Sequence, residues 1–259
     1  MRTTAIMNLK GGTGKTVTTV NAAAILAEIH GRRVLAVDAD SQANLTELLS
    51  HGLPDGLSIG GLADLLQGKK AFALPSKIKN VCILPADPSL MALDISAAGN
   101  GTADPMALAN WLQDQEANYE RVLIDCPPAF SAGAMAALIA ADDVVIPLKL
   151  DAFGIRGLAN LMEQIRNMRR VNPDLVIAGV LPTMFYPDET QHKAEEDLRK
   201  SLAAAGVHCF HHVRRSIRMD GSTFEQLPLL KYSPKSKTCY EYKLFVRDLL
   251  AMGGDDDEL

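Results

Sequence analysis

The stretch Lys10-Gly11-Gly12-Thr13-Gly14-Lys15-Thr16 lies between an apolar run, residues 4–7, and a segment of helical periodicity, residues 17–29. A strand, a glycine-rich turn and a helix in this order predict a phosphate-binding loop, because glycines let backbone N–H groups converge at a helix N-terminus, which favours anions. We expect Lys15 to reach the β- and γ-phosphates of a nucleotide and the Thr16 hydroxyl to bind Mg²⁺, which prefers oxygen ligands. The expected nucleotide contacts are therefore Gly11, Gly12, Thr13, Gly14, Lys15, Thr16 and Val17.

The loop departs from the standard pattern at its start, where Leu9 replaces the usual glycine and Lys10 is an added lysine. In this respect it resembles the deviant Walker A loop of the ParA/MinD group of P-loop ATPases. The resemblance implies that Lys10 reaches the nucleotide of a partner subunit in an ATP-sandwich dimer. Lys10 and Lys15 are thus candidate catalytic residues.

Two acids, Asp38 and Asp40, end the next predicted strand, residues 33–38. Spaced i and i+2, they should lie at the carboxyl edge of a sheet, beside the phosphate-binding loop. One acid there can hold Mg²⁺ and its waters, and another can orient the water that attacks the γ-phosphate. The segment resembles the family's Asp-x-Asp-Pro-Gln switch with Ser41 in place of proline, which implies that Asp40 orients the water and Asp38 lies nearer the metal.

A third acid, Asp125, ends the apolar strand predicted for residues 121–125, as a Walker B element requires. Asp125-Cys126-Pro127-Pro128 resembles the family's switch II. The candidate metal residues are therefore Thr16, Asp38 and Asp125. No basic partner lies near Cys126 in the sequence, so we expect a small buried residue there rather than a nucleophile.

Apolar runs of strand length alternate with helical periodicity along the 259 residues, of which 47% are hydrophobic. This alternation predicts an α/β fold, a mostly parallel twisted sheet with helices on both faces. The resemblance implies that residues 1–252 form one P-loop ATPase domain. A glycine pair followed by four acids predicts an acidic, disordered tail over 253–259. The stretch Gly179-Val180-Leu181-Pro182-Thr183-Met184 continues the resemblance; in relatives this strand leads to the adenine pocket, which makes Thr183 and Met184 candidates for base contact. We expect strands near 3–8, 33–38, 81–84, 121–125, 143–148 and 176–182, and helices near 15–30, 58–67, 103–117, 131–140, 154–171, 188–205 and 234–252.

The chain carries a net charge of −5, so any contact with nucleic acid must come from a local basic surface. Between residues 211 and 247 there are eight Lys/Arg and three acids. The segment 214–218 resembles the basic segment that ParA-type ATPases use on non-specific DNA, although an ordinary solvated basic face has the same composition. The candidate DNA-binding residues are Arg215, Arg218, Lys235 and Lys237.

Four cysteines without a Cys-x-x-Cys pair argue against a metal cluster, and the adjacent His211 and His212 are expected to point to opposite faces of a strand. No transmembrane or signal pattern is recognised, so we expect a cytoplasmic, nucleoid-associated protein. The resemblance implies an ATP- and Mg²⁺-dependent DNA partition ATPase that dimerises on ATP, binds non-specific double-stranded DNA and is stimulated by a ParB-like centromere-binding protein. The alternatives are a MinD-like positioning ATPase on a membrane and a P-loop metabolic ATPase. The first is disfavoured because an anionic membrane would repel the acidic tail.

Overall fold

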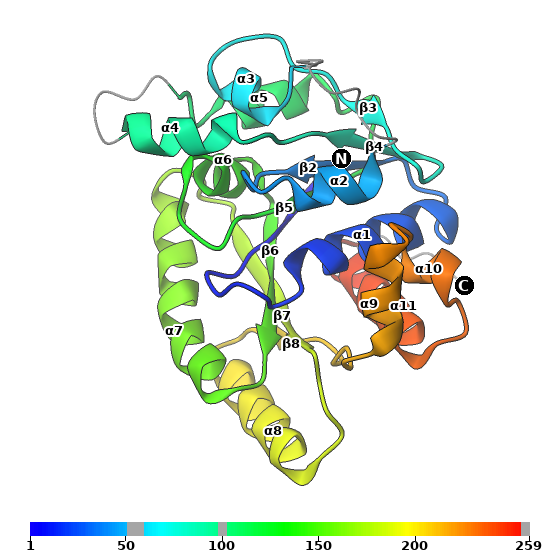
Figure 1. Ribbon diagram of the computed structural model, residues 1–259. Helices are drawn as coiled ribbons and strands as arrows, with labels where there is room; N and C mark the ends of the chain where they lie inside the picture. Colours follow the sequence, from blue (N-terminus) through cyan, green and yellow to red (C-terminus); the bar gives the residue numbers. More distant parts are fainter. Residues whose placement is uncertain (51–59, 98–102, 255–259) are drawn as a thin grey trace.

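The computed structural model describes residues 1–50, 60–97 and 103–254 (Figure 1). Its strands form a single sheet in the order β3-β4-β2-β5-β1-β6-β7-β8, in which only the pair β3–β4 is antiparallel. The central strands β2 and β5 are buried at every residue, which explains why they read as continuous apolar runs. The strands are β1 (Arg2–Ile6), β2 (Val34–Asp38), β3 (Leu74–Pro75), β4 (Val81–Leu84), β5 (Arg121–Asp125), β6 (Asp143–Lys149), β7 (Val176–Thr183) and β8 (His208–Cys209).

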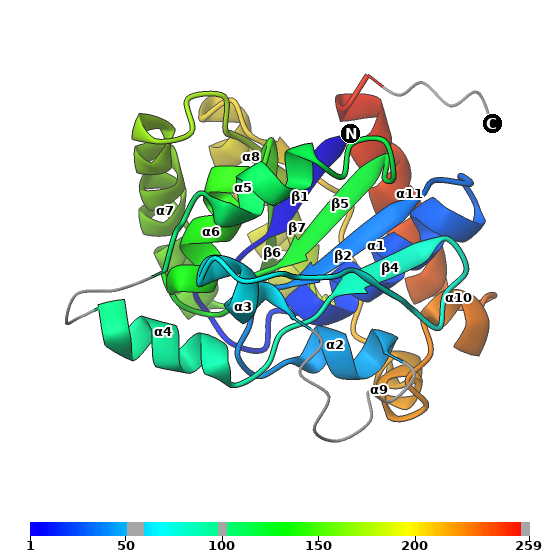
Figure 2. The same cartoon turned by 90° about the horizontal axis from the view of Figure 1, so that it is seen from above.

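Two layers of helices cover the sheet, and each layer has its own apolar core. Figures 1 and 2 show α6 and α7 on one side and α1 with α11 on the other. The first layer contains α3 (Leu62–Leu66), α4 (Ser89–Ala97), α5 (Ala107–Gln113), α6 (Ala132–Ala140), α7 (Ala152–Asn167) and α8 (Glu189–Ala204). The second contains α1 (Lys15–Glu28), α2 (Asn44–Leu49), α9 (Ile217–Phe224), α10 (Leu229–Tyr232) and α11 (Lys237–Met252).

All six predicted strands are present, and the predicted α/β fold with a mostly parallel sheet is confirmed. The edge strands β3 and β8 were not predicted, since each has only two residues. The short helices α2, α4, α9 and α10 were not predicted either. Part of the predicted helix 58–67 and most of the tail 253–259 lie outside the described residues. None of the helices in the described part of the chain is long and apolar enough to cross a membrane.

The topology brings three functional segments to one edge of the sheet. In the parallel register, Asp125 at the end of β5 is paired with Ile6 at the end of β1 and with Asp38 at the end of β2. The loop that follows β1 therefore starts beside both acids, at the carboxyl ends of the strands, where open α/β sheets bind their ligands.

Candidate active site

The phosphate-binding loop connects β1 to α1 and is shaped by its glycines. Gly12 and Gly14 adopt φ angles of +70° and +84°, which other residues adopt only with strain, and Gly14 directly precedes the helix. Asn8 fixes the entry to the loop: its side-chain amide donates to Pro147 O at 2.7 Å, and its Oδ1 accepts from Lys10 N at 2.9 Å. The loop is thus built from residues of its own segment and attached to the neighbouring strand β6.

Lys15, the first residue of α1, is 8% exposed and its Nζ lies 3.5 Å from Lys10 O. Burial lowers the pKa of Lys15, and the nearby negative charges of Asp125 and, more weakly, Asp40 oppose this shift. The structure therefore brings together three residues that the sequence predicted as parts of one site.

Thr16 and Asp125 are in direct contact, since the Thr16 hydroxyl donates to Asp125 Oδ2 at 2.6 Å. Asp125 is almost fully buried, and its other oxygen, Oδ1, has no hydrogen-bond partner among the described residues. Burial raises the pKa of Asp125 well above its usual value, and the charge of Asp38 adds to this effect. An ionised carboxylate in this position needs a positive charge beside it.

Asp38 is fully buried and both of its oxygens accept hydrogen bonds from the chain. Asp38 Oδ2 accepts from the backbone N–H and the hydroxyl of Thr46, both at 2.8 Å, and Oδ1 accepts from Asp40 N at 3.1 Å. Burial raises the pKa of Asp38 to about 6, although these hydrogen bonds oppose it. We therefore propose that Asp38 holds the turn that carries Asp40; the metal contact expected from the sequence stays a prediction.

Asp40 is the partly exposed member of the acidic pair. Its Oδ1 accepts from Gln42 N at 3.0 Å, so Ser41 is part of a hydrogen-bonded turn without the proline usual in relatives. The turn packs closely against α6, because a Cβ at Gly133 in that helix would be 2.3 Å from Ala39 O. Asp40 thus lies at the edge of the site on a turn held by both Asp38 and α6.

A pocket of about 210 Å³ opens beside the loop. Thr183 and Met184, predicted to contact the base, both line it, together with Gly14 and Val17 of the phosphate-binding loop and helix. Met184 has a positive φ of 53°, and the Thr183 hydroxyl donates to Thr13 O at 2.8 Å. The remaining lining residues, not foreseen from the sequence, are Val213, Arg214, Arg215, Ser216, Met219, Asp220 and Tyr242.

Comparisons with known proteins agree with this geometry. A family model described as an AAA domain matches residues 1–177. The chromosome-partitioning ATPase Soj of Thermus thermophilus is 32% identical over 256 residues, which are 97% of this chain and 96% of Soj. The chromosome partitioning protein ParA of Caulobacter vibrioides is 32% identical over 98% of this chain and 96% of its own length. The chain belongs to the ParA/MinD family of P-loop ATPases.

A solved structure of a different activity is also similar to this ParA/MinD-family chain. Cobyrinic acid a,c-diamide synthase from Mycobacterium smegmatis, with a bound ATP analogue and magnesium, is 27% identical. The alignment covers 100% of this chain and 98% of that chain, with a TM-score of 0.79. The fold is therefore shared with a small-molecule enzyme as well as with partition ATPases.

The site of this ParA/MinD-family ATPase fits a magnesium ion. The buried Oδ1 of Asp125 lacks a partner among the described residues, and the Thr16 hydroxyl lies against the same carboxylate. Both are hard oxygen ligands of the kind that Mg²⁺ takes beside nucleotide phosphates. Thr16 and Asp125 are the residues that would hold the ion or its waters, and the ion would neutralise phosphate charge there.

Lys10, the lysine characteristic of the family, forms an ion pair within its own chain. Its Nζ lies 2.8 and 2.7 Å from the two oxygens of Asp151, the residue that caps α7 by accepting from Gly154 N at 2.8 Å. The bond to Lys10 lowers the pKa of Asp151 to about 2. In this structure Lys10 therefore points to the start of α7, whereas Lys15 stays in the loop.

The four candidate DNA-binding residues are exposed around α9 and the start of α11, which lie with α10 in one corner of the molecule (Figure 1). Among the described residues, ion pairs engage three other basic residues of this region, Arg214 with Glu241, Lys231 with Glu28 and Arg247 with Asp248, and none engages the four. The basic surplus counted from the sequence is thus partly neutralised. Of the eight basic residues, five have no ion pair within the described part of the chain: the exposed Arg215, Arg218, Lys235 and Lys237, and the half-buried Lys243 on α11.

The cysteines and histidines make no metal site within the described residues. Cys126 is fully buried, as predicted, and burial raises the pKa of its thiol. The expected orientation of His211 and His212 was wrong, because their rings lie 4.5 Å apart. These residues follow the end of β8 at Cys209, so the alternation of a regular strand does not apply to them.

Proposed function

We propose that this chain is an ATP-dependent DNA partition switch. ATP with Mg²⁺ binds at residues 10–16, two protomers close on their nucleotides with Lys10 reaching across, and the dimer presents a basic surface to non-specific DNA. Hydrolysis, stimulated by a ParB-like centromere-binding partner, releases the DNA. The observation that carries the proposal is the position of Lys10, which is directed out of its own loop and held there by a partly exposed ion pair with Asp151 that a second protomer would have to replace.

The chemistry proposed for the site follows from the charges around it. Phosphoryl transfer needs positioning and charge stabilisation more than covalent help. Lys15 and the backbone N–H groups of the loop stabilise the charge on the phosphates, while Asp40 orients the attacking water. The base occupies the pocket beside the loop, against Thr183 and Met184. Asp38 supports Asp40 from behind through the hydrogen-bonded turn.

The test of the proposed function is binding to non-specific duplex DNA with ATP, with ADP and without nucleotide, over a range of salt. We expect ATP alone to confer salt-sensitive binding, because each neutralised phosphate releases counterions. Binding that is absent or indifferent to nucleotide would contradict the proposal. Association with the nucleoid in the cell would be a consequence of this binding.

Arg218→Ala is expected to weaken ATP-dependent DNA binding and to reduce the salt slope by about one, since one phosphate contact is lost. Lys200→Ala is the matched control, because Lys200 is an exposed cation on α8 that pairs with Glu196. Titrations of labelled DNA at several salt concentrations measure both effects. Equal slopes for wild type and Arg218→Ala would exclude this residue from the DNA surface.

Asp151→Asn is expected to favour the dimer. Asparagine caps helices as well as aspartate does, so α7 should keep its start, but Lys10 loses its charged partner. An ion pair exposed to this degree contributes little, so ATP-dependent dimerisation should occur at an about threefold lower protein concentration. Analytical ultracentrifugation with ATP measures the shift. A midpoint shifted to higher concentration would show that Asp151 supports the dimer instead of competing with it.

A small-molecule ligase is the second candidate, favoured by the similarity to cobyrinic acid a,c-diamide synthase. Such an enzyme couples ATP to a carboxylic acid substrate, so its hydrolysis would be stimulated by that substrate and unaffected by DNA. The DNA titration above separates the two candidates.

A further inference from the structure

One wall of the pocket beside the loop is formed by a segment that follows β8. We call residues 209–216 the wall segment; its last four residues line the pocket. It is hydrogen-bonded to the end of β7: Val213 N donates to Pro182 O at 2.8 Å, and Phe185 N donates to Val213 O at 3.1 Å. Arg215 N donates in turn to Phe185 O at 3.0 Å. These hydrogen bonds fix the position of the wall segment relative to Thr183 and Met184.

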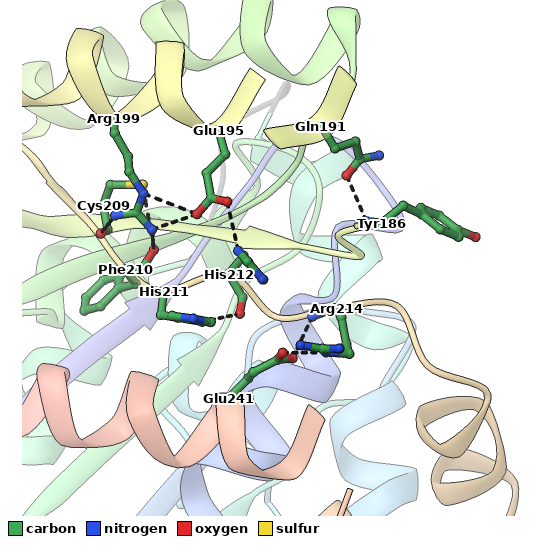
Figure 3. A network of polar contacts seen from close by, with 10 residues as sticks. All are labelled: Tyr186, Gln191, Glu195, Arg199, Cys209, Phe210, His211, His212, Arg214 and Glu241. Carbon is green, nitrogen blue, oxygen red and sulfur yellow. Dashed lines mark hydrogen bonds and ion pairs between the residues drawn. The ribbon is translucent and has the colours of Figure 1, made fainter. Parts of the chain in front are cut away.

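On the α8 side, Glu195 holds the wall segment (Figure 3). This carboxylate is 8% exposed, accepts from Arg199 at 2.7 Å and lies 2.9 Å from His212 Nδ1. Arg199 also donates to Cys209 O at 2.8 Å and to Phe210 O at 2.9 Å. Burial alone would raise the pKa of Glu195, but the bonds from His212 and Arg199 lower it to about 2, so Glu195 is an anion at neutral pH.

The His212 ring links this carboxylate to the other wall of the pocket. It is stacked on the ring of Phe185, with centroids 3.8 Å apart and planes inclined by 15°. Phe185 is 2% exposed and directly follows Met184, which lines the pocket with a left-handed backbone conformation. Glu195 thus contacts His212 in one wall of the pocket, and the His212 ring in turn packs on Phe185, which follows the other wall.

On the α11 side, Glu241 holds the same segment two residues further on. It is 2% exposed, accepts from Arg214 N at 2.9 Å and binds the guanidinium of Arg214 with its other oxygen. Tyr242, the next residue, lines the pocket, and its hydroxyl lies 3.2 Å from that of Thr18 on α1. Figure 3 shows the two glutamates approaching the wall segment from α8 and α11, which belong to opposite layers.

We propose that Glu195 and Glu241 are positioning residues for the nucleotide base. Neither residue lines the pocket. Both are buried carboxylates, and burying a charged carboxylate costs free energy unless it is fully paired. Neither has another role in the site described above. Both carboxylates hold the wall segment in place relative to the end of β7, and the distance between these two segments sets the width of the pocket. The inference rests on the proposed function, because it takes the pocket to be the base site.

The test compares ATP with inorganic tripolyphosphate, which offers the same phosphates to the loop but no base. In Glu195→Gln and Glu241→Gln, we expect ATP affinity to fall about tenfold, as for the loss of a charged hydrogen bond that orders a site. Tripolyphosphate affinity should stay within about twofold of wild type, since its contacts are with residues 10–16 only. Glu196→Gln is the matched control, because Glu196 is the exposed neighbour on α8 and pairs with Lys200; both affinities should be unchanged.

Thermal melts establish which variants fold. If Glu195→Gln does not fold, His212→Gln takes its place, since its side chain is partly exposed and its loss breaks the same contact. A folded variant with unchanged ATP affinity, or one in which both ligands weaken equally, would overturn the proposal. Wild-type protein that binds ATP no more tightly than tripolyphosphate would instead refute the base pocket itself, and a lack of ATP-dependent DNA binding would refute the partition function alone.

Discussion

Lys15→Ala is expected to bind ATP at least about a hundredfold more weakly than wild type and to show no ATP-dependent dimerisation. Lys15 is buried in the loop close to Asp125 and Asp40, and its charge offsets theirs. Without it, a triphosphate would meet two uncompensated carboxylates in a site where charges are poorly screened. Calorimetric titration with ATP, and sedimentation with and without ATP, measure the two effects.

Lys10→Ala is the matched comparison, because it removes the same charge from the same loop. Lys10 pairs with Asp151 and not with the acids of the site, so monomeric protein should bind ATP with nearly unchanged affinity. Dimerisation should still be lost if Lys10 completes the site of a second protomer. Full ATP-dependent dimerisation in Lys15→Ala would contradict the proposed cycle altogether.

The second large effect is expected for Asp40→Ala: ATP hydrolysis about a hundredfold slower, with ATP binding retained. The carboxylate is partly exposed at the edge of the site and held by a turn whose other contacts come from Asp38 and Gln42. Its removal should therefore leave the loop intact while the attacking water loses its orientation. The variant should also remain on DNA longer in the presence of ATP.

Single-turnover hydrolysis and DNA dissociation rates check this expectation. Ser41→Ala serves as the control, since it changes the same turn without removing a carboxylate. Hydrolysis at the wild-type rate in Asp40→Ala would assign the orientation of the water to another residue. A loss of ATP binding would show that the turn, and not the carboxylate, is what the site requires.

The sequence was most informative where structure depends on local pattern. The strands at residues 81–84 and 121–125 were predicted at their observed bounds, because buried parallel strands are continuous apolar runs between polar residues. Helix α9 was not predicted, since its eight residues include Asp220 and Gly221, which have low helix propensity, and a helix of two turns is too short to give a clear sequence pattern. The phosphate-binding loop was recognisable because all its parts lie within seven residues.

Contacts between distant residues could not be predicted in the same way. Asp151 follows a strand and precedes a helical pattern, so its role as a helix cap was readable, but its bond to Lys10 joins residues 141 positions apart. The two hydrogen bonds from Thr46 to one Asp38 oxygen join residues eight positions apart and could not be predicted from the sequence. Glu241 likewise lies far along the chain from the pocket residue that it holds.

The hydrogen bond from the Thr183 hydroxyl to Thr13 O joins the phosphate-binding loop to the end of β7, across the intervening strand β6. A side chain of the fold itself therefore helps to hold the loop, so part of the entropy cost of ordering the loop is met on folding. Binding should consequently release heat without the large opposing entropy that accompanies the ordering of a flexible loop. Thr183→Val keeps the shape of the side chain but removes the hydrogen-bond donor. In this variant the loop should become ordered partly on ligand binding, so the binding entropy should be less favourable.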